Sequence, residues 1–296
     1  MKRIFYCNIT YGCNSNCVFC YSHNTWHNNR PHNEISLDEY FDYLVRHKVV
    51  NGDRVVVNGG EPLLHSEVQN LLDRLVEIEC EVIVYTNGRL LSKLKMNNIA
   101  ENFRFIIPIH GYEELHDKIT GIKGSYAETI EGLNFITNSN CKVDIKIIMN
   151  HEMILSDEVF EKTLQALDNI PFNHAVHITK MADTIISKKN RCVSVDNEYA
   201  SKYTKELYDY YYGKCKIKLF DTCIKKIDNS ELLDVIPMDE EIKVFFKDLN
   251  QESEILLEKP YMSCMNTCEK QVHCHSAVGE YTVLEFYKNV VCVGLE

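Results

Sequence analysis

Short apolar runs and segments of helical spacing alternate along the first 180 residues of the chain. The runs are rich in β-branched residues and end at glycines or polar residues, which is typical of buried strands. Between them, apolar residues such as Leu37, Tyr40, Phe41 and Leu44 recur every three or four positions, which indicates amphipathic helices. The pattern predicts strands over residues 3–10, 54–58, 81–86, 103–109, 142–149 and 175–179, and helices over 37–48, 67–78, 91–99, 126–137 and 157–167.

This succession of strand–helix units predicts an α/β fold. Continuously apolar strands separated by helices form parallel sheets whose outer face the helices cover. We therefore expect a partial (β/α)6 barrel over residues 1–195. The pattern changes afterwards: residues 196–260 predict a bridging helix and linker region, and residues 261–296 a small cysteine-rich module.

Composition and charge narrow the function only a little. The chain of 296 residues is 45% hydrophobic and 25% charged, as in ordinary globular proteins. No stretch approaches the ~20 apolar residues of a membrane helix, and the start turns polar too soon for a signal peptide, so we expect a cytoplasmic protein without a membrane partner. The net charge of −11 argues against a nucleic-acid partner, although a local basic patch would leave an RNA substrate open.

Three cysteines near the start are the strongest chemical signal. Thirteen cysteines in a chain of this length, without a signal peptide, point to metal binding or catalysis rather than to disulfides. Cys13, Cys17 and Cys20 have the spacing C-x3-C-x2-C, in a loop after the first predicted strand. Three thiolates can hold three irons of a four-iron cluster and leave the fourth open for chemistry. Three buried or zinc-bound thiols are the alternative.

This loop resembles the signature loop of the radical SAM superfamily. In that family the three cysteines hold a [4Fe–4S] cluster, and S-adenosylmethionine binds the open iron. The resemblance implies both cofactors here, with Phe19, before the last cysteine, beside the adenine. It also implies the partial barrel, with the site at the C-terminal ends of the strands.

Other segments at predicted strand ends resemble the family as well. The two glycines of Gly59-Gly60-Glu61 let the backbone approach a ligand closely, and Glu61 can accept hydrogen bonds from an ammonium group. The chain departs from many relatives, which have serine at the place of Pro108 and aspartate at the place of His110. Asn150 is equally well explained as a cap before the next helix. The resemblance implies contacts to S-adenosylmethionine from Gly59, Gly60, Glu61, Asn87, His110 and Asn150.

A second cysteine group lies near the end of the chain. Cys264, Cys268, Cys274 and Cys292 resemble the twitch or SPASM modules of radical SAM maturases, which hold auxiliary iron–sulfur clusters, and Cys223 would be a substitute ligand. The resemblance implies a second iron–sulfur cluster. A structural zinc site, or no metal, remains an alternative.

Together these features predict a radical SAM enzyme. As the resemblance implies, an external donor such as flavodoxin or ferredoxin would reduce the cluster. S-adenosylmethionine would then be cleaved to a 5′-deoxyadenosyl radical, which takes hydrogen from the substrate. The leading hypothesis is a ribosomally made peptide matured by a crosslink or thioether. Because the chain starts at the first strand, we expect a separate leader-recognition protein, or a short leader bound by the barrel itself.

Two other classes of function stay open. The first is small-molecule oxidation, or activation of a glycyl-radical partner. The second is a non-catalytic iron–sulfur or zinc-binding adaptor on a decayed barrel, against which the intact Gly59-Gly60-Glu61 segment argues. No residue pattern identifies a catalytic acid or hydrogen donor, the bond formed, or the oligomeric state.

Overall fold

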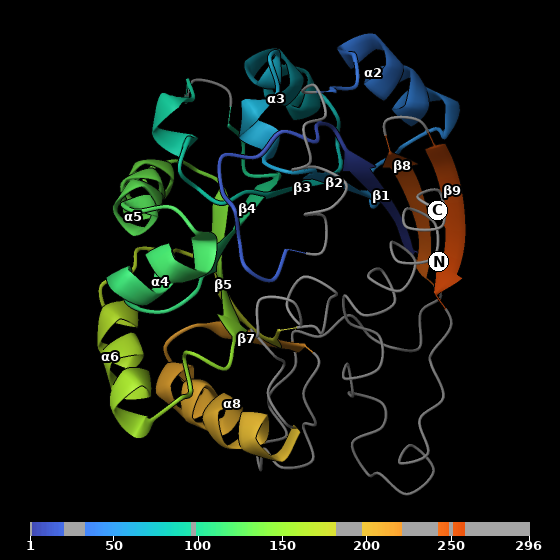
Figure 1. The fold of residues 1–296 in the computed structure, drawn as a ribbon. Coiled ribbons are helices and arrows are strands. Elements are labelled where there is room, and N and C mark those ends of the chain that lie inside the picture. The colour runs from blue at the N-terminus through green and yellow to red at the C-terminus, as the bar shows by residue number, and fades with distance from the viewer. Residues whose placement is uncertain are drawn as a thin grey trace, which may run out of the picture.

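The computed structural model describes residues 2–20, 33–95, 99–181, 197–220, 242–248 and 251–257. In this part of the chain a single curved sheet has the strand order β7-β6-β5-β4-β3-β2-β1-β8-β9 (Figure 1). Neighbouring strands are parallel from β7 through to β8, and β9 is antiparallel to β8. The bounds are β1 Lys2–Asn8, β2 Arg54–Asn58, β3 Glu81–Tyr85, β4 Phe103–Ile109, β5 Lys142–Met149, β6 Ala175–Lys180, β7 Lys216–Phe220, β8 Ile242–Asp248 and β9 Gln251–Leu257.

Helices cover the outer, convex face of this sheet (Figure 1). In the described part of the chain, each connection from β1 through to β7 contains helical structure, as crossovers between parallel strands usually do. The first of these helices begins as expected, because the Ser36 hydroxyl caps it by accepting a hydrogen bond from the Glu39 N–H at 3.2 Å. The bounds are α2 Leu37–Arg46, η1 Pro62–Leu64, α3 Val68–Val76, η2 Leu91–Lys93, α4 Glu113–Thr120, α5 Ser125–Ile136, α6 Asp157–Leu167 and α8 Asn197–Tyr211.

The expected α/β fold with a partial barrel is confirmed, and the sheet stays open, with β7 and β9 at its two edges. Strands β2, β4 and β5 and helix α6 have the predicted bounds. Helix α4 was not predicted from the sequence. It is only eight residues long and ends at Gly121, whose left-handed φ of 68° stops the helix.

The described part of residues 196–260 contributes three strands to the same sheet. Strand β8 pairs with β1 on the side away from β2, and its Phe245 ring stacks on Phe5 with centroids 4.7 Å apart. The proposed divisions at residues 195 and 260 stay predictions, and residues 261–296 lie outside the described part of the chain.

The two faces of the sheet differ in polarity. Residues such as Phe5, Val84 and Phe105 point to the helices and are fully buried in the main core. On the opposite face, β1 to β4 carry a small apolar cluster centred on Val56, Ile83 and Ile106. Strands β4 to β7 alternate instead, and they place polar residues on that face: Arg104, Asp144, Lys146, His177, Thr179 and Lys218.

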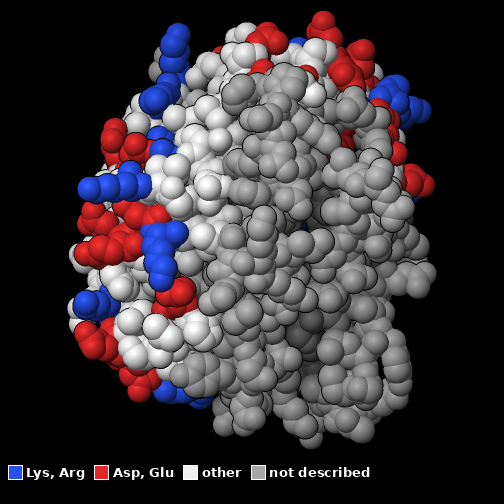
Figure 2. Space-filling model, in the orientation of Figure 1, with Lys and Arg blue, Asp and Glu red and all other residues white. Residues whose placement is uncertain are grey.

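The outer surface is mixed in charge. Figure 2 shows acidic and basic side chains interspersed along the edge of the molecule that carries the helices in this view. In the described residues, no helix combines the length and the apolar character needed to cross a membrane.

Candidate functional site

The cysteine loop begins as a continuation of the sheet. Three bonds join residues 9–12 to the end of β2: Ile9 N–H donates to the Asn58 carbonyl at 2.9 Å, Gly60 N–H to Thr10 at 2.9 Å, and Glu61 N–H to Gly12 at 2.7 Å. A Cβ at position 60 would lie 2.2 Å from the Gly12 carbonyl oxygen. The sequence explained these glycines by the approach of a ligand. In the structure, the close approach is that of the cysteine loop itself.

The middle of the loop lies on the C-terminal end of α4. Asn16 N–H donates to the Thr120 carbonyl at 2.8 Å, and Val18 N–H donates to the Ile119 carbonyl at 2.9 Å. The last carbonyls of a helix lack partners within the helix, so they can hold the loop. A side chain at position 121 would meet the Asn16 carbonyl at 2.9 Å, so a glycine there permits this contact.

Asp117 fixes the corner between α4 and α5. Its carboxylate accepts hydrogen bonds from the Ser125 hydroxyl at 2.9 Å and the Tyr126 N–H at 2.8 Å, and also from the Gly124 N–H. Burial acts to raise the pKa of Asp117, but these hydrogen bonds hold it below its usual value. The segment from His116 to Gly121 thus supports the cysteine loop.

The three cysteines lie in the loop after β1, at the C-terminal edge of the parallel strands. All three residues are partly exposed. Burial of its thiol group raises the pKa of Cys13 to about 12, with Glu61 and Cys20 adding to the rise and Arg89 opposing it. The pKa of Cys17 is raised chiefly by burial and then by Cys20 and Cys13.

Among the described residues, no group of three or more His, Cys, Asp or Glu side chains is arranged to hold a metal ion. A four-iron cluster binds each thiolate through a different iron. Its ligands therefore surround a cluster rather than converge on one ion.

Glu61 is fully buried between the ends of β2 and β3. Its carboxylate accepts hydrogen bonds from the Thr86 hydroxyl at 2.6 Å, the Asn87 N–H at 2.7 Å and the Leu63 N–H at 3.0 Å. Burial raises its pKa, and these hydrogen bonds oppose the rise. The side chain joins two strand ends, and a carboxylate still has acceptor capacity beyond three bonds.

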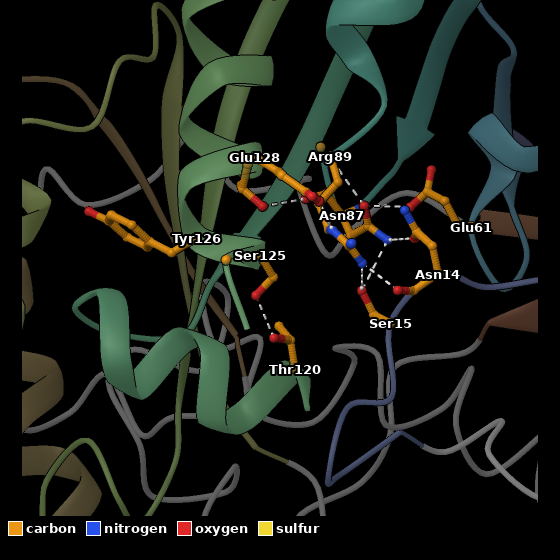
Figure 3. A network of polar contacts seen from close by, with 12 residues as sticks. Asn14, Ser15, Glu61, Asn87, Arg89, Thr120, Ser125, Tyr126 and Glu128 are labelled. Atoms are coloured by element: carbon orange, nitrogen blue, oxygen red, sulfur yellow. Dashed lines mark hydrogen bonds and ion pairs between the residues drawn. The ribbon is translucent and has the colours of Figure 1, made fainter. Parts of the chain in front are cut away.

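The turn after β3 holds the loop from a third side (Figure 3). The Asn87 side-chain amide donates to Asn14 Oδ1 at 2.6 Å and to Ser15 Oγ at 3.4 Å. Arg89 also points to this stretch: its Nη1 donates to the Asn14 carbonyl and, at 3.3 Å, to Ser15 Oγ. The predicted site residue Asn87 therefore contacts the loop itself.

Phe19 and His110 face one another across the site. Their rings are 5.2 Å apart in an edge-on arrangement. His110 follows β4 and is buried, and its Nδ1 has no hydrogen-bond partner in the described part of the chain. Burial, His116 and Lys146 lower its pKa well below the usual value, so the ring is neutral. A buried, neutral imidazole with an unused nitrogen is a polar group suited to a ligand.

Asn150 lies at the end of β5 and caps its own turn. Its Oδ1 accepts from Met153 N–H at 3.0 Å, and its Nδ2 donates to the Ile148 carbonyl at 3.2 Å. The sequence offered Asn150 as a cap before the next helix, but α6 is capped by Ser156, and Asn150 caps the turn that precedes it. Its contact to a ligand stays a prediction.

Comparison with known proteins agrees with this geometry. Residues 7–167 match the model of the radical SAM superfamily, which is more than half of the chain. The chain belongs to the radical SAM superfamily. This superfamily match spans the end of β1, the cysteine loop, β2 to β5 and α2 to α6.

Two curated radical SAM relatives are similar to parts of the chain. AdoMet-dependent heme synthase of Methanosarcina barkeri is 25% identical over 232 residues, which are 75% of this chain and 62% of the relative. Subtilosin biosynthesis protein AlbA of Bacillus subtilis is 26% identical over 165 residues, 53% of this chain and 33% of AlbA. The chain thus spans less than two thirds of the length of either relative.

The fold is similar to that of a solved radical SAM structure. Streptococcus suis SuiB, solved with its precursor peptide SuiA, aligns with a TM-score of 0.54 at 14% identity, over 82% of this chain and 57% of SuiB. SuiB has also been solved with S-adenosylmethionine, with a TM-score of 0.57 at 13% identity, over 92% of this chain and 72% of SuiB. At this identity the likeness concerns the fold.

The predicted auxiliary ligands lie outside the described residues. These are Cys223, Cys264, Cys268, Cys274 and Cys292.

Sequence reasoning missed the polar groups on the inner face of the radical SAM barrel. Asp144 on β5 is fully buried, and its carboxylate lies 2.6 Å from His174 Nδ1, 2.7 Å from His177 Nε2 and 3.6 Å from Lys218 Nζ. Burial acts to raise the pKa of Asp144, but these neighbours hold it below its usual range. The available signal was the alternation Lys142-Val143-Asp144-Ile145-Lys146 within a strand that was interpreted as a continuous apolar run.

Proposed function

We propose that the chain is a radical SAM enzyme in which Cys13, Cys17 and Cys20 bind a [4Fe–4S] cluster. The observation that carries this proposal is the support of the cysteine loop. Hydrogen bonds hold it from the end of β2, from the last carbonyls of α4 and from the turn after β3. A loop supported on three sides can present three cysteines at a fixed spacing, as a cluster site requires.

The surrounding residues fit S-adenosylmethionine as the second cofactor. The unused His110 Nδ1 and the ring of Phe19 offer a polar and an aromatic contact, and Glu61 retains acceptor capacity for an ammonium group. Gly59, Gly60, Asn87 and Asn150 complete the predicted set. Held by Cys13, Cys17 and Cys20, a reduced cluster would supply the electron for cleavage of a carbon–sulfur bond of S-adenosylmethionine, and the resulting deoxyadenosyl group would take a hydrogen atom from the substrate.

The chain's own residues have two tasks in this scheme. The buried carboxylate of Glu61 accepts three hydrogen bonds and so holds the ends of β2 and β3 together. The ring of Phe19 packs against His110 at the end of β4, and this contact would limit the access of water to the cluster.

We propose a ribosomally made peptide as the substrate class. AlbA is named for the biosynthesis of a bacteriocin, and SuiB is solved with a precursor peptide. The maturation would install a crosslink or thioether. A separate leader-recognition protein and an external electron donor such as flavodoxin or ferredoxin belong to the same proposal. So does a second iron–sulfur cluster at Cys264, Cys268, Cys274 and Cys292.

A small-molecule substrate is the second candidate. It is favoured by the similarity to AdoMet-dependent heme synthase, which extends over 75% of this chain. A mass change in a peptide encoded beside this chain would support the peptide substrate. Turnover of a small molecule alone would support the second candidate.

The cysteine assignment is tested by deoxyadenosine formation. Reconstituted chain, S-adenosylmethionine and dithionite should yield 5′-deoxyadenosine, and Cys13→Ala, Cys17→Ala and Cys20→Ala should each reduce the yield at least ~100-fold, because a lost ligand frees an iron. Cys141→Ala, which removes a buried thiol from the far end of β5, should keep the wild-type yield. A yield close to that of the wild type in any of the three loop variants would contradict the assignment.

Iron content tests the second cluster. Two clusters require about eight irons per chain. About four irons per chain, lost entirely in the Cys17→Ala variant, would restrict the proposal to one cluster.

A further inference from the structure

Arg89 makes two sets of contacts with opposite edges of its guanidinium. Its Nε donates to Glu128 Oε2 at 2.6 Å, while Nη1 donates to the Asn14 carbonyl and to Ser15 Oγ (Figure 3). The Arg89 side chain is only 10% exposed, whereas Glu128, on α5, is half exposed. The guanidinium therefore bridges α5 and the cysteine loop.

The other contacts in this region cannot replace that bridge. Asn87 also bonds to Asn14 and Ser15, but it belongs to the same turn as Arg89 and does not reach α5 through its side chain. The Thr129 hydroxyl of α5 donates to the Asn87 carbonyl at 3.0 Å, which anchors the turn and not the loop. Among the described residues, Arg89 alone joins the loop directly to a charged group on α5.

We propose that Arg89, oriented by Glu128, is a positioning residue that fixes the cysteine loop for the cluster. Arg89 touches backbone and hydroxyl oxygens next to Cys13 without being a ligand. Its planar fork holds donors on separate nitrogens at a fixed spacing and contacts both partners together, whereas the three donors of a lysine ammonium all lie on one atom and do not span that spacing. The cluster part of this inference rests on the proposed function.

The first test uses the full chain before iron is added. Hydrogen exchange followed by mass spectrometry reports on the amides of Asn16 and Val18, which are bonded to α4 only when the loop is docked. In Arg89→Gln we expect exchange within residues 13–20 to become about tenfold faster, because charge-assisted bonds that hold the loop are lost. Arg89→Lys should resemble Arg89→Gln, and Glu128→Gln should show a smaller increase.

The matched control is Arg54→Gln. Arg54 Nε donates to Glu81 Oε2 at the same 2.6 Å, but this ion pair joins β2 and β3 away from the loop. Exchange within residues 13–20 should be unchanged in this variant. If Arg89→Gln does not fold, Glu128→Gln takes its place, because it leaves Arg89 present and removes the charge that orients it.

The second test uses the reconstituted chain. Iron loss to a chelator, followed by absorbance, should be about tenfold faster in Arg89→Gln and Arg89→Lys than in the wild type or Arg54→Gln. The electron paramagnetic resonance spectrum of the dithionite-reduced cluster should also change in shape.

Wild-type exchange within residues 13–20 in Arg89→Gln would overturn the proposal, as would faster exchange with wild-type iron retention and spectrum. Failure of the proposed function gives a different result: the wild-type chain would then bind no four-iron cluster, while the exchange difference at the loop would persist.

Discussion

Glu61 shows how a single residue gains a structural task that the sequence does not reveal. Its position after two glycines predicted a contact to S-adenosylmethionine. The structure shows its carboxylate fully buried and bonded to Leu63, Thr86 and Asn87. The same group can hold two strand ends together and still offer a lone pair to a ligand.

Glu61→Gln should destabilise the fold even without cofactors. The amide nitrogen of glutamine is a donor facing donors, so at least one buried group loses its partner, at a cost of ~1–3 kcal/mol. Urea denaturation of the iron-free chain measures this loss. Glu131→Gln, at an exposed position on α5, is the control and should be neutral. Equal stability of Glu61→Gln and wild type would show that the three hydrogen bonds contribute nothing net.

At the scale of elements, the strands of the sheet differ in the polarity of their inner face. Strands β1 to β3 follow the expectation for buried parallel strands, since both faces are largely apolar. Strands β4 to β7 keep apolar residues towards the helices and place ionisable ones on the inner face. Paired charges there are expected, because an unpaired buried charge is costly.

The inner-face network predicts a pH dependence of stability. Burial lowers the pKa of His177 to about 4 from 6.5, with Lys218 and Lys146 acting in the same direction and Asp144 in the opposite one. As the pH falls from 6.5 to 4, the unfolded chain binds a proton that the folded chain does not. This group therefore removes stability at up to ~1.4 kcal/mol per pH unit. This contribution to stability is complete above pH 6.5 and decreases as the pH falls below that value.

His177→Gln should flatten the pH dependence by about that slope. The free energy of unfolding in urea, measured between pH 4.5 and 7, gives the comparison. His151→Gln, at an exposed position, should keep the wild-type slope. An unchanged slope in His177→Gln would refute the neutral, buried state of this ring.

At the scale of the whole molecule, distant parts of the chain form one sheet. Strand β8 lies beside β1, and side chains tie the two regions together: Tyr11 donates to Asp248 at 2.8 Å, and Lys247 pairs with Glu39 at 2.6 Å. Phe245 is nearly buried against Phe5. These contacts join residues 242–257 to the edge from which the cysteine loop departs.

Phe245→Ala should therefore weaken the entire sheet. Loss of a buried phenylalanine costs ~3–5 kcal/mol, and one cooperative transition at lower denaturant concentration is expected. Denaturation followed by circular dichroism and by aromatic fluorescence measures it, with the exposed Val50→Ala as control. A separate early transition that leaves the main one unchanged would show that residues 242–257 unfold independently of the barrel.

The sequence by itself determined most elements of the first 180 residues, their order and the cysteine loop. Hydrophobic periodicity is local, so β4, β5 and α6 were predicted with their observed bounds. The spacing of Cys13, Cys17 and Cys20 is local as well, and it identified the family that the comparison confirms. The short helix α4 was missed, because eight residues carry little periodic signal.

Only the tertiary structure decided what holds these residues in place. The bridge from Glu128 through Arg89 to Asn14, the carboxylate of Asp144 among two histidines, and the pairing of β8 with β1 join residues 30 to about 240 positions apart. Periodicity reports which face of an element is apolar. It carries no information on which polar groups meet, because that depends on strand order, register and the path of the chain between elements.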